Sequence, residues 1–358
     1  MNAWLKHLLV LLCCLPALVA AQEAAATLKS LRGQATIERA GNKHPAQAGE
    51  TLYPKDRIVT GADGYVGVGF RDHSSLAIGP NSDIDLNKYS FNPTTHQGEQ
   101  QVRVRSGSMA VISGKLAKTS PEAVKFNTTT VTLGVRGTQF VIEAADNANA
   151  LLWRDEQQQT VHSGSGLCWE SGAGAATSSC LADRFVLLPD PSGHVGVISL
   201  ATASTNLLVQ KAYASVQADE QGLRQADLSE AEARARYQQL LQMLPPVPQT
   251  FVVRLAAGSA DQLTPDSAAV LAQVRAALAS WPVVPDVDIV GHTDSTGSDA
   301  QNDALSLQRA QAVARMIDSP AIQPNRLHTA GRGKRQLLVP TPENTPEPQN
   351  RRVEITVY

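Results

Sequence analysis

One segment near the C-terminus constrains the fold of this chain most. Residues 286–292 alternate between apolar and polar side chains, which predicts a strand. A loop that contains Asp294 follows, and apolar residues then recur at helical spacing. Arg309 lies about 40° from Leu305 on that helix, inside its apolar stripe. A guanidinium in such a place needs an anionic partner, because an unpaired buried charge is unfavourable.

Two partners for Arg309 fit this pattern. The first is Asp294, in an internal ion pair that fixes the loop between the strand and the helix. The second is an external zwitterion, whose ammonium would contact Asp294 and whose carboxylate would take the two-pronged guanidinium. The residue pattern taken alone favours the internal pair.

A wider set of residues resembles a known family. It comprises the run HTDSTGSDAQNDALSLQRAQAV at 292–313, the GRGK segment at 331–334 and the NRRVEI segment at 350–355. In order and spacing these residues resemble the peptidoglycan-binding domain found at the C-terminus of outer-membrane protein A and in related Pal- and MotB-type proteins. The resemblance covers residues 250–358.

The resemblance implies a ligand, the diaminopimelate of a peptidoglycan stem peptide. The family's aspartate, which holds the amino group, falls on Asp294, and its helix arginine, which holds the carboxylate, falls on Arg309. The other positions that the family places around this pocket are Thr293, Asn302, Leu305 and Arg352. Residues 256–260 depart from the family's pattern, because they read Ala-Ala-Gly-Ser-Ala where the family usually has aromatic residues. We therefore expect one altered pocket wall.

A basic loop follows the predicted site. It contains Arg332, Lys334 and Arg335, and we expect it to lie beside Arg351 and Arg352. Such a loop is either simply solvated or adds attraction for stem-peptide carboxylates.

Residues 1–21 are typical of a secretory signal peptide. A basic start precedes an apolar run that is too short for a lasting membrane span, and small residues follow it. Cleavage near Gln22 would leave Cys168 and Cys180 as the cysteines of the exported chain. A pair this close together in an exported protein predicts a disulfide.

Residues 24–200 predict an all-β domain, because short alternating runs are separated by turn-forming residues. The expected strands are Ala35–Glu38, Arg57–Thr60, Tyr65–Phe70, Ser75–Ile78, Asp83–Leu86, Val102–Arg105 and Met109–Ile112. The segments that resemble the FecR domain are Gly49-Glu50, Asp56 to Thr60, Val66 to Asp72, Ser82 to Leu86, Ser106 to Ser108 and, above all, Gly134 to Phe140. In the last segment we expect Gly134 and Gly137 to permit tight backbone paths and Arg136 to have a local partner.

FecR itself is a transmembrane regulator with a cytoplasmic signalling segment. This sequence shows neither that segment nor a spanning helix, so its signalling function does not carry over. The resemblance leaves a β-rich scaffold that contacts a periplasmic or outer-membrane protein or a glycan. The alternative is a sensory module that recognises a ligand, with the C-terminal domain serving only to localise it.

The rest of the chain divides into two parts. Residues 204–249 predict a helical linker that ends in the proline run 245–248. Residues 250–358 predict an α/β sandwich of βαβαββ type. The expected protein is therefore multidomain, with an N-terminal all-β domain, a helical linker and a C-terminal α/β domain.

Several function classes are disfavoured. A net charge of −2 without a basic tract gives no reason to expect a nucleic-acid partner. Ser306 has neither a glycine elbow nor a neighbouring base, and His292 with Asp294 lacks a third metal ligand. We therefore expect a non-catalytic protein without cofactor or metal. Its expected place is the periplasm of a Gram-negative cell envelope, associated with peptidoglycan and the outer membrane.

Overall fold

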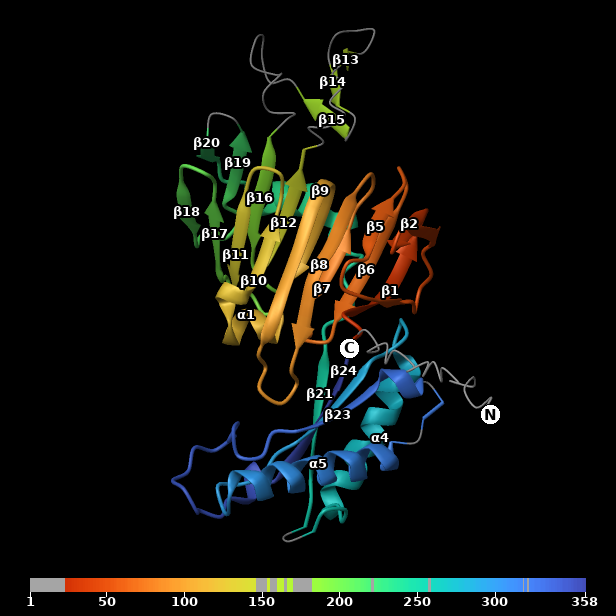
Figure 1. The fold of residues 1–358 in the computed structure, drawn as a ribbon, viewed down its shortest axis with the longest axis vertical. Helices are drawn as coiled ribbons and strands as arrows, with labels where there is room; N and C mark the ends of the chain where they lie inside the picture. The colour runs from red at the N-terminus through yellow and green to blue at the C-terminus, as the bar shows by residue number, and fades with distance from the viewer. Residues whose placement is uncertain are drawn as a thin grey trace, which may run out of the picture.

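The computed structural model describes residues 23–145, 153–154, 160–163, 166–169, 182–219, 222–256, 259–317, 319–320 and 322–358. The predicted signal peptide lies outside the described residues, as does Cys180, the second cysteine of the predicted disulfide. Within the described ranges, no helix is both long and apolar enough to cross a membrane. Figure 1 shows a large β domain followed by a smaller α/β domain.

The β domain is one continuous sheet of seventeen strands, which folds into two halves that share β9 (Gly98–Ile112). One half has the order β4-β1-β6-β7-β9-β12-β16-β19-β20, and the other has the order β3-β2-β5-β8-β9-β10-β11-β17-β18. The strands are β1 (Ala26–Arg32), β2 (Ala35–Arg39), β3 (Asn42–Pro45), β4 (Thr51–Leu52), β5 (Arg57–Thr60), β6 (Tyr65–Phe70), β7 (Ser75–Ile78), β8 (Asp83–Phe91), β10 (Val124–Asn127), β11 (Thr132–Arg136), β12 (Gln139–Ala144), β16 (Asp183–Leu188), β17 (Val197–Ala201), β18 (Asn206–Val209), β19 (Ser215–Asp219) and β20 (Gly222–Gln225). A separate small sheet contains β13 (Trp153–Arg154), β14 (Thr160–Ser163) and β15 (Gly166–Trp169).

The strands expected from the sequence are confirmed, and two of them are the halves of β9. The first half of β9 pairs with β8, and the second half pairs with β7 and β12. Gly107 lies at the change, with φ +90°, and a Cβ there would lie 2.5 Å from the Cα of Ser82. Glycine is the residue that tolerates both conditions, so one strand can serve both halves of the sheet. Phe70, Phe126, Phe140 and Phe185 fill the space between the halves.

The predicted helical linker over residues 204–249 is wrong for its first half. Residues 206–225 contain β18, β19 and β20, which extend the sheet. Val209 is buried where β18 pairs with β17, and Val216 is buried where β19 pairs with β16. Tertiary pairing of this kind overrides local propensity, which explains the error.

A helix does follow, but it belongs to the β domain. Helix α3 (Glu230–Leu241) begins with a capping box between Ser229 and Glu232. Its buried residues Tyr237 and Leu240 pack against the outer face of the sheet. The residues left to connect the domains are therefore essentially the proline run 245–248.

The C-terminal domain has the predicted βαβαββ order. Its elements are β21 (Gln249–Arg254), α4 (Pro265–Ser280), β22 (Val287–Gly291), α5 (Asp299–Met316), β23 (Leu327–Gly331) and β24 (Arg352–Val357). The sheet order is β21-β24-β22-β23, and β22 runs parallel to β23. Both helices share one core with the sheet, formed by residues such as Leu271, Val274, Ile289, Val313 and Ile355. Asp288 lies on the opposite face of β22 from Ile289, as strand alternation requires.

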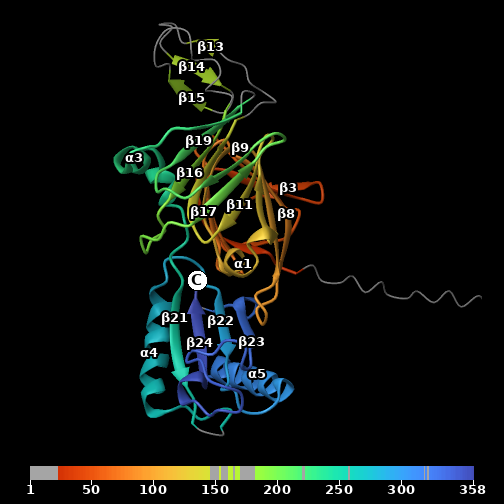
Figure 2. The same ribbon diagram turned by 90° about the vertical axis from the view of Figure 1, so that its left-hand side faces the viewer.

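The two domains meet through buried polar contacts, at the end of the sandwich where helix α1 (Lys115–Thr119) lies (Figure 2). The Lys29 amine donates to the Asp286 carboxylate at 2.6 Å and to the carbonyls of Tyr358 at 2.7 Å and Val284 at 3.1 Å. All three donors of this buried ammonium are therefore satisfied by the C-terminal domain.

A second group of contacts continues this interface. The His73 ring lies 2.8 Å from the Asp288 carboxylate, which also accepts from the Tyr358 hydroxyl at 3.2 Å. The hairpin between β8 and β9 extends to the C-terminal domain (Figure 1), where its His96 contacts Arg332. The interface thus uses charged and polar groups from several loops of the β domain.

Candidate functional site

The candidate site lies where β22 and β23 end against helix α5. Gly291 and Gly331 close these strands. A Cβ on Gly291 would lie 2.7 Å from the Ser306 carbonyl carbon, and one on Gly331 would lie 2.6 Å from the Leu307 amide nitrogen. Because neither residue has a side chain, α5 packs directly against the strand ends. This packing brings Arg309, about one turn further along α5, to the end of β22.

Arg309 is buried without a carboxylate partner among the described residues. It is 1% exposed. Its Nε donates to the Ser259 carbonyl at 3.2 Å, and its Nη1 donates to the His292 carbonyl at 3.4 Å. Burial and then the charge of Arg351 lower the pKa of Arg309, while Asp294 opposes that shift. Two carbonyls do not neutralise a guanidinium, so among the described residues Arg309 has no counterion in direct contact.

Asp294 has a different partner from the one that the sequence pattern favoured. Its Oδ2 accepts from Arg351 at 2.9 Å, and its Oδ1 accepts from the Thr296 amide at 3.2 Å. Burial alone would raise the pKa of Asp294, but the hydrogen bonds from Arg351 and Thr296 hold that pKa below its ordinary value. Asp294 is therefore ionised and accepts from a guanidinium other than that of Arg309.

Three further predicted residues surround this cluster. Asn302 is buried and donates to the Thr296 carbonyl at 3.0 Å, so it fixes the loop that carries Asp294. The Thr293 hydroxyl is buried, and it has no hydrogen-bond partner in the described part of the chain. Leu305 is half-buried about one turn before Arg309. Asn302 thus positions the loop, while the other two offer a free hydroxyl and an apolar surface.

Arg352 has internal partners. Its Nε and Nη2 donate to the Glu354 carboxylate at 2.8 and 2.7 Å, and its guanidinium also donates to the Gln336 carbonyl at 3.3 Å. Its charge is therefore neutralised within the domain. The charge of Arg352 adds to the effect of burial in lowering the pKa of His292 to about 3, so that imidazole is neutral.

Arg351 was not among the residues predicted for the site. The signal was present in the sequence, since Asn-Arg-Arg offers two adjacent arginines. Adjacent residues at the start of a strand point to opposite faces, so only one of them can reach the Asp294 loop. The choice between them depends on the position of β24, which the sequence pattern alone does not show.

The basic loop is engaged in ion pairs and contacts. Lys334 lies 2.6 Å from Glu343 and 3.2 Å from Asp299. Arg335 donates to Asp303 at 2.7 Å, and Arg332 contacts His96 of the β domain. These charges therefore have partners in the structure.

The cluster is suited to a small ligand that carries both charges. Arg309 and Arg351 supply two positive charges against the single carboxylate of Asp294. A ligand carboxylate would complete the charge balance at Arg309, and an ammonium beside it would interact favourably with Asp294. Within the described ranges, no group of three His, Cys, Asp or Glu residues is placed to hold a metal ion.

Comparison with known proteins identifies the two domains. Residues 256–351 match the OmpA family, and residues 56–154 match the family described as FecR protein. The chain therefore carries an OmpA family domain at its C-terminus and a FecR domain in its N-terminal region.

Individual relatives are similar over part of their length. The probable lipoprotein YiaD of Escherichia coli is 35% identical over 99 residues, which are 28% of this chain and 45% of that protein. Outer membrane protein A of Bordetella avium is 41% identical over 68 residues, which are 19% of this chain and 35% of that protein. This chain thus spans less than half of either relative. The crystal structure of the peptidoglycan-associated lipoprotein from Burkholderia pseudomallei matches with 25% identity and a TM-score of 0.27, over 30% of this chain and 90% of that one.

Proposed function

We propose that this protein binds peptidoglycan non-covalently by holding the diaminopimelate end of a stem peptide between Asp294 and Arg309. The observation that carries the proposal is the buried Arg309 guanidinium, which has no carboxylate partner among the described residues. A diaminopimelate end has an ammonium and a carboxylate on one carbon, so one ligand can satisfy both side chains. Charge-assisted contacts of this kind contribute about 1.5–3 kcal/mol each.

The domain composition supports a role in the cell envelope. The OmpA family domain suggests cell-wall binding, and the OmpA-like relatives are proteins of the periplasm or the outer membrane. OmpA and FecR domains are typically non-catalytic. We infer a non-catalytic protein in the periplasm of a Gram-negative bacterium, held at the peptidoglycan and associated with the outer membrane.

The chemistry of the cell wall provides a direct test. Purified sacculi of the diaminopimelate type should sediment the protein, whereas sacculi with lysine in the same stem position should not. Lysine keeps the ammonium but lacks the carboxylate on that carbon, so Arg309 would remain without its anion. Equal sedimentation with both wall types would contradict the proposed specificity.

The FecR domain is proposed to contact a further partner. The proposed partner is a periplasmic or outer-membrane protein or a glycan, and the alternative is a small ligand that makes this domain a sensor. Affinity purification of the mature full-length protein from cell envelopes separates the two. A stoichiometric protein or glycan supports the scaffold, and a small molecule released on denaturation supports the sensor.

We infer that residues 1–21 are removed and that Cys168 and Cys180 form a disulfide. Intact mass spectrometry of periplasmic protein, with and without reduction, should show loss of the leader and a mass gain of two hydrogen atoms on reduction. A mass that retains Met1, or two thiols that alkylate without reduction, would contradict the corresponding part.

A further inference from the structure

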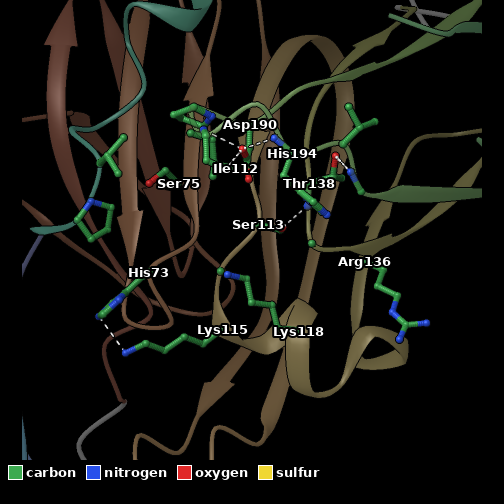
Figure 3. A pocket seen from close by; sticks show the side chains of 18 of the residues that line it. His73, Ser75, Ile112, Ser113, Lys115, Lys118, Arg136, Thr138, Asp190 and His194 are labelled. Atoms are coloured by element: carbon green, nitrogen blue, oxygen red, sulfur yellow. Dashed lines mark hydrogen bonds between the residues drawn. The ribbon is translucent and has the colours of Figure 1, made fainter. Parts of the chain in front are cut away.

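A pocket of about 820 Å³ lies where the β domain meets the proline segment that leads to the C-terminal domain (Figure 3). Its walls come from the end of β9, helix α1, the turn after β11 and the loop before β17. The segment Pro245–Pro248 closes one side. A pocket of this size is in the range that holds small organic ligands.

The charges around this pocket are mostly positive. Lys115, Lys118 and Arg136 line it, and Asp190 is its acidic residue. The Asp190 carboxylate accepts hydrogen bonds from the Ser192 amide and hydroxyl and from the His194 amide. These donors all belong to the turn that contains Asp190. The pocket therefore attracts anions.

The lysines are placed on one side of helix α1. Lys115 and Lys118 are three residues apart, so their side chains are neighbours. Lys115 is half-buried with its amine 3.4 Å from the His73 ring. Lys118 is exposed and, within the described ranges, has no carboxylate within 4 Å. In Figure 3 its side chain lies between Lys115 and Arg136.

Arg136 was expected to have a local partner, and the structure shows otherwise. It is exposed, and no carboxylate of the described chain lies within 4 Å of it. The next residues are held firmly, because the Thr138 amide donates to the Ser113 hydroxyl at 2.7 Å and the Ser113 amide donates to the Thr138 carbonyl at 3.0 Å. A fixed backbone thus presents a free guanidinium at the pocket.

The remaining surface suits the organic part of a ligand. Ile112 and Val247 provide apolar contacts, and Ser75 provides a hydroxyl. Val247 is 56% exposed, so its side chain offers apolar surface to a ligand. A ligand in the pocket would cover part of it.

We propose that this pocket binds a small organic anion, whose phosphate or carboxylate is held by Lys118 and whose body lies against Ile112 and Val247. Lys115 and Arg136, on either side of Lys118, add to the positive charge that attracts the anion. The inference rests on the proposal that the FecR domain recognises a further partner, and it is independent of wall binding. The pocket lies beside the contacts between the two domains, because Val247 lies just before β21 and Lys115 lies 3.4 Å from His73, which contacts Asp288 of the C-terminal domain.

The test uses the mature full-length protein and isothermal titration with two probes, ribose 5-phosphate for phosphate and glucuronate for carboxylate. Lys118→Gln should weaken binding roughly 10-fold or more, since it removes one charge-assisted contact. Arg136→Gln should act in the same direction. Lys43→Gln is the matched control, because Lys43 is an exposed lysine outside this pocket.

The outcomes separate the possibilities. Binding of the phosphate alone or of the carboxylate alone, weakened by Lys118→Gln, supports the site and identifies its anion; binding of both supports a general anion site. No binding of either probe at millimolar concentration overturns the proposal, as does binding that Lys118→Gln and Arg136→Gln leave unchanged. Sedimentation with sacculi is measured on the same variants and should be unaltered. A failure of wall binding is therefore distinguishable from a failure of this pocket.

Discussion

Arg309 and Arg326 are both buried in the C-terminal domain, at 1% and 2% exposure, but their partners differ. Arg326 lies at the domain interface, where it donates to the Thr27 hydroxyl at 2.8 Å, lies 3.4 Å from the Asp286 carboxylate and also donates to the Gly49 carbonyl. Arg309 has two carbonyls and no acid among the described residues. A buried cation whose partners are all internal holds a structure together, whereas one that lacks its counterion is suited to a ligand.

Arg352 belongs with Arg326 in this comparison. It donates hydrogen bonds to Glu354 and to the Gln336 carbonyl, so its guanidinium stabilises the domain and is not available to a ligand. Position in the structure therefore distinguishes arginines that the sequence presents as equivalent. Four predictions test this distinction.

The largest effect is expected at the interface. Asp286→Ala leaves Lys29 and Arg326 buried without their shared carboxylate, and it should lower the free energy of unfolding by about 3–5 kcal/mol. Denaturant unfolding measures this change. Glu99→Ala, which removes an exposed carboxylate, is the control and should have little effect.

The folded fraction of Asp286→Ala should still sediment with diaminopimelate-type sacculi, because the wall site is formed by other residues. If stability is unchanged, the interface contacts do not contribute as the structure indicates. If wall binding is lost from folded protein, the two regions are coupled.

At the wall site, substitutions should reduce wall binding and leave stability almost unchanged. Arg309→Ala or Asp294→Ala should weaken wall binding roughly 10- to 150-fold, the equivalent of about 1.5–3 kcal/mol, with little loss of thermal stability. The double variant should add little, because both residues act on one ligand. Arg309→Lys should also fail, since an ammonium cannot make the two-pronged contact. Sedimentation and melting temperature are measured on the same preparations.

Arg315→Ala is the matched control, because Arg315 is an exposed arginine on the same helix. Its wall binding should equal that of the unmodified protein. Well-folded Arg309 and Asp294 variants that bind at full affinity would refute the assignment. Variants that lose stability but not affinity would indicate a purely structural cluster.

The adjacent arginines should differ more subtly. Arg351→Ala removes the present partner of Asp294 and should weaken wall binding by about fivefold, the equivalent of about 1 kcal/mol for one orienting hydrogen bond. Arg352→Ala should instead lower stability, because it leaves Glu354 and the Gln336 carbonyl without their donor. The opposite result, affinity lost at Arg352 and retained at Arg351, would restore the role that the family resemblance implied for Arg352.

The smallest effect is expected from pH. The pKa of Asp294 is below its ordinary value, so its contribution is present above about pH 4 and is lost only as the pH falls through the folded-state pKa. His292 and His96, each with a pKa of about 3, stay neutral in the same range. Wall binding should therefore change little between about pH 5 and 8. A midpoint near pH 6 in sedimentation would implicate another group.

Local patterns in the sequence were sufficient for much of the fold. The strand, loop and helix that carry Asp294 and Arg309 follow from apolar periodicity, which depends on residues close in the chain. The alternating runs of the β domain were predictable for the same reason. The resemblance to two families added the ligand class and the domain identities, and the family comparison confirms those identities.

Only the tertiary structure decided the partners. The assignment of Arg351 to Asp294 needs the position of β24, and Lys29 meets Asp286 from 257 residues away. The strands within residues 206–225 likewise depend on pairing with β16, β17 and each other, which the composition of the segment does not show. Periodicity reports which face of an element is buried, because that depends on its own residues. It carries no information on what covers that face, because long-range packing determines the contacts.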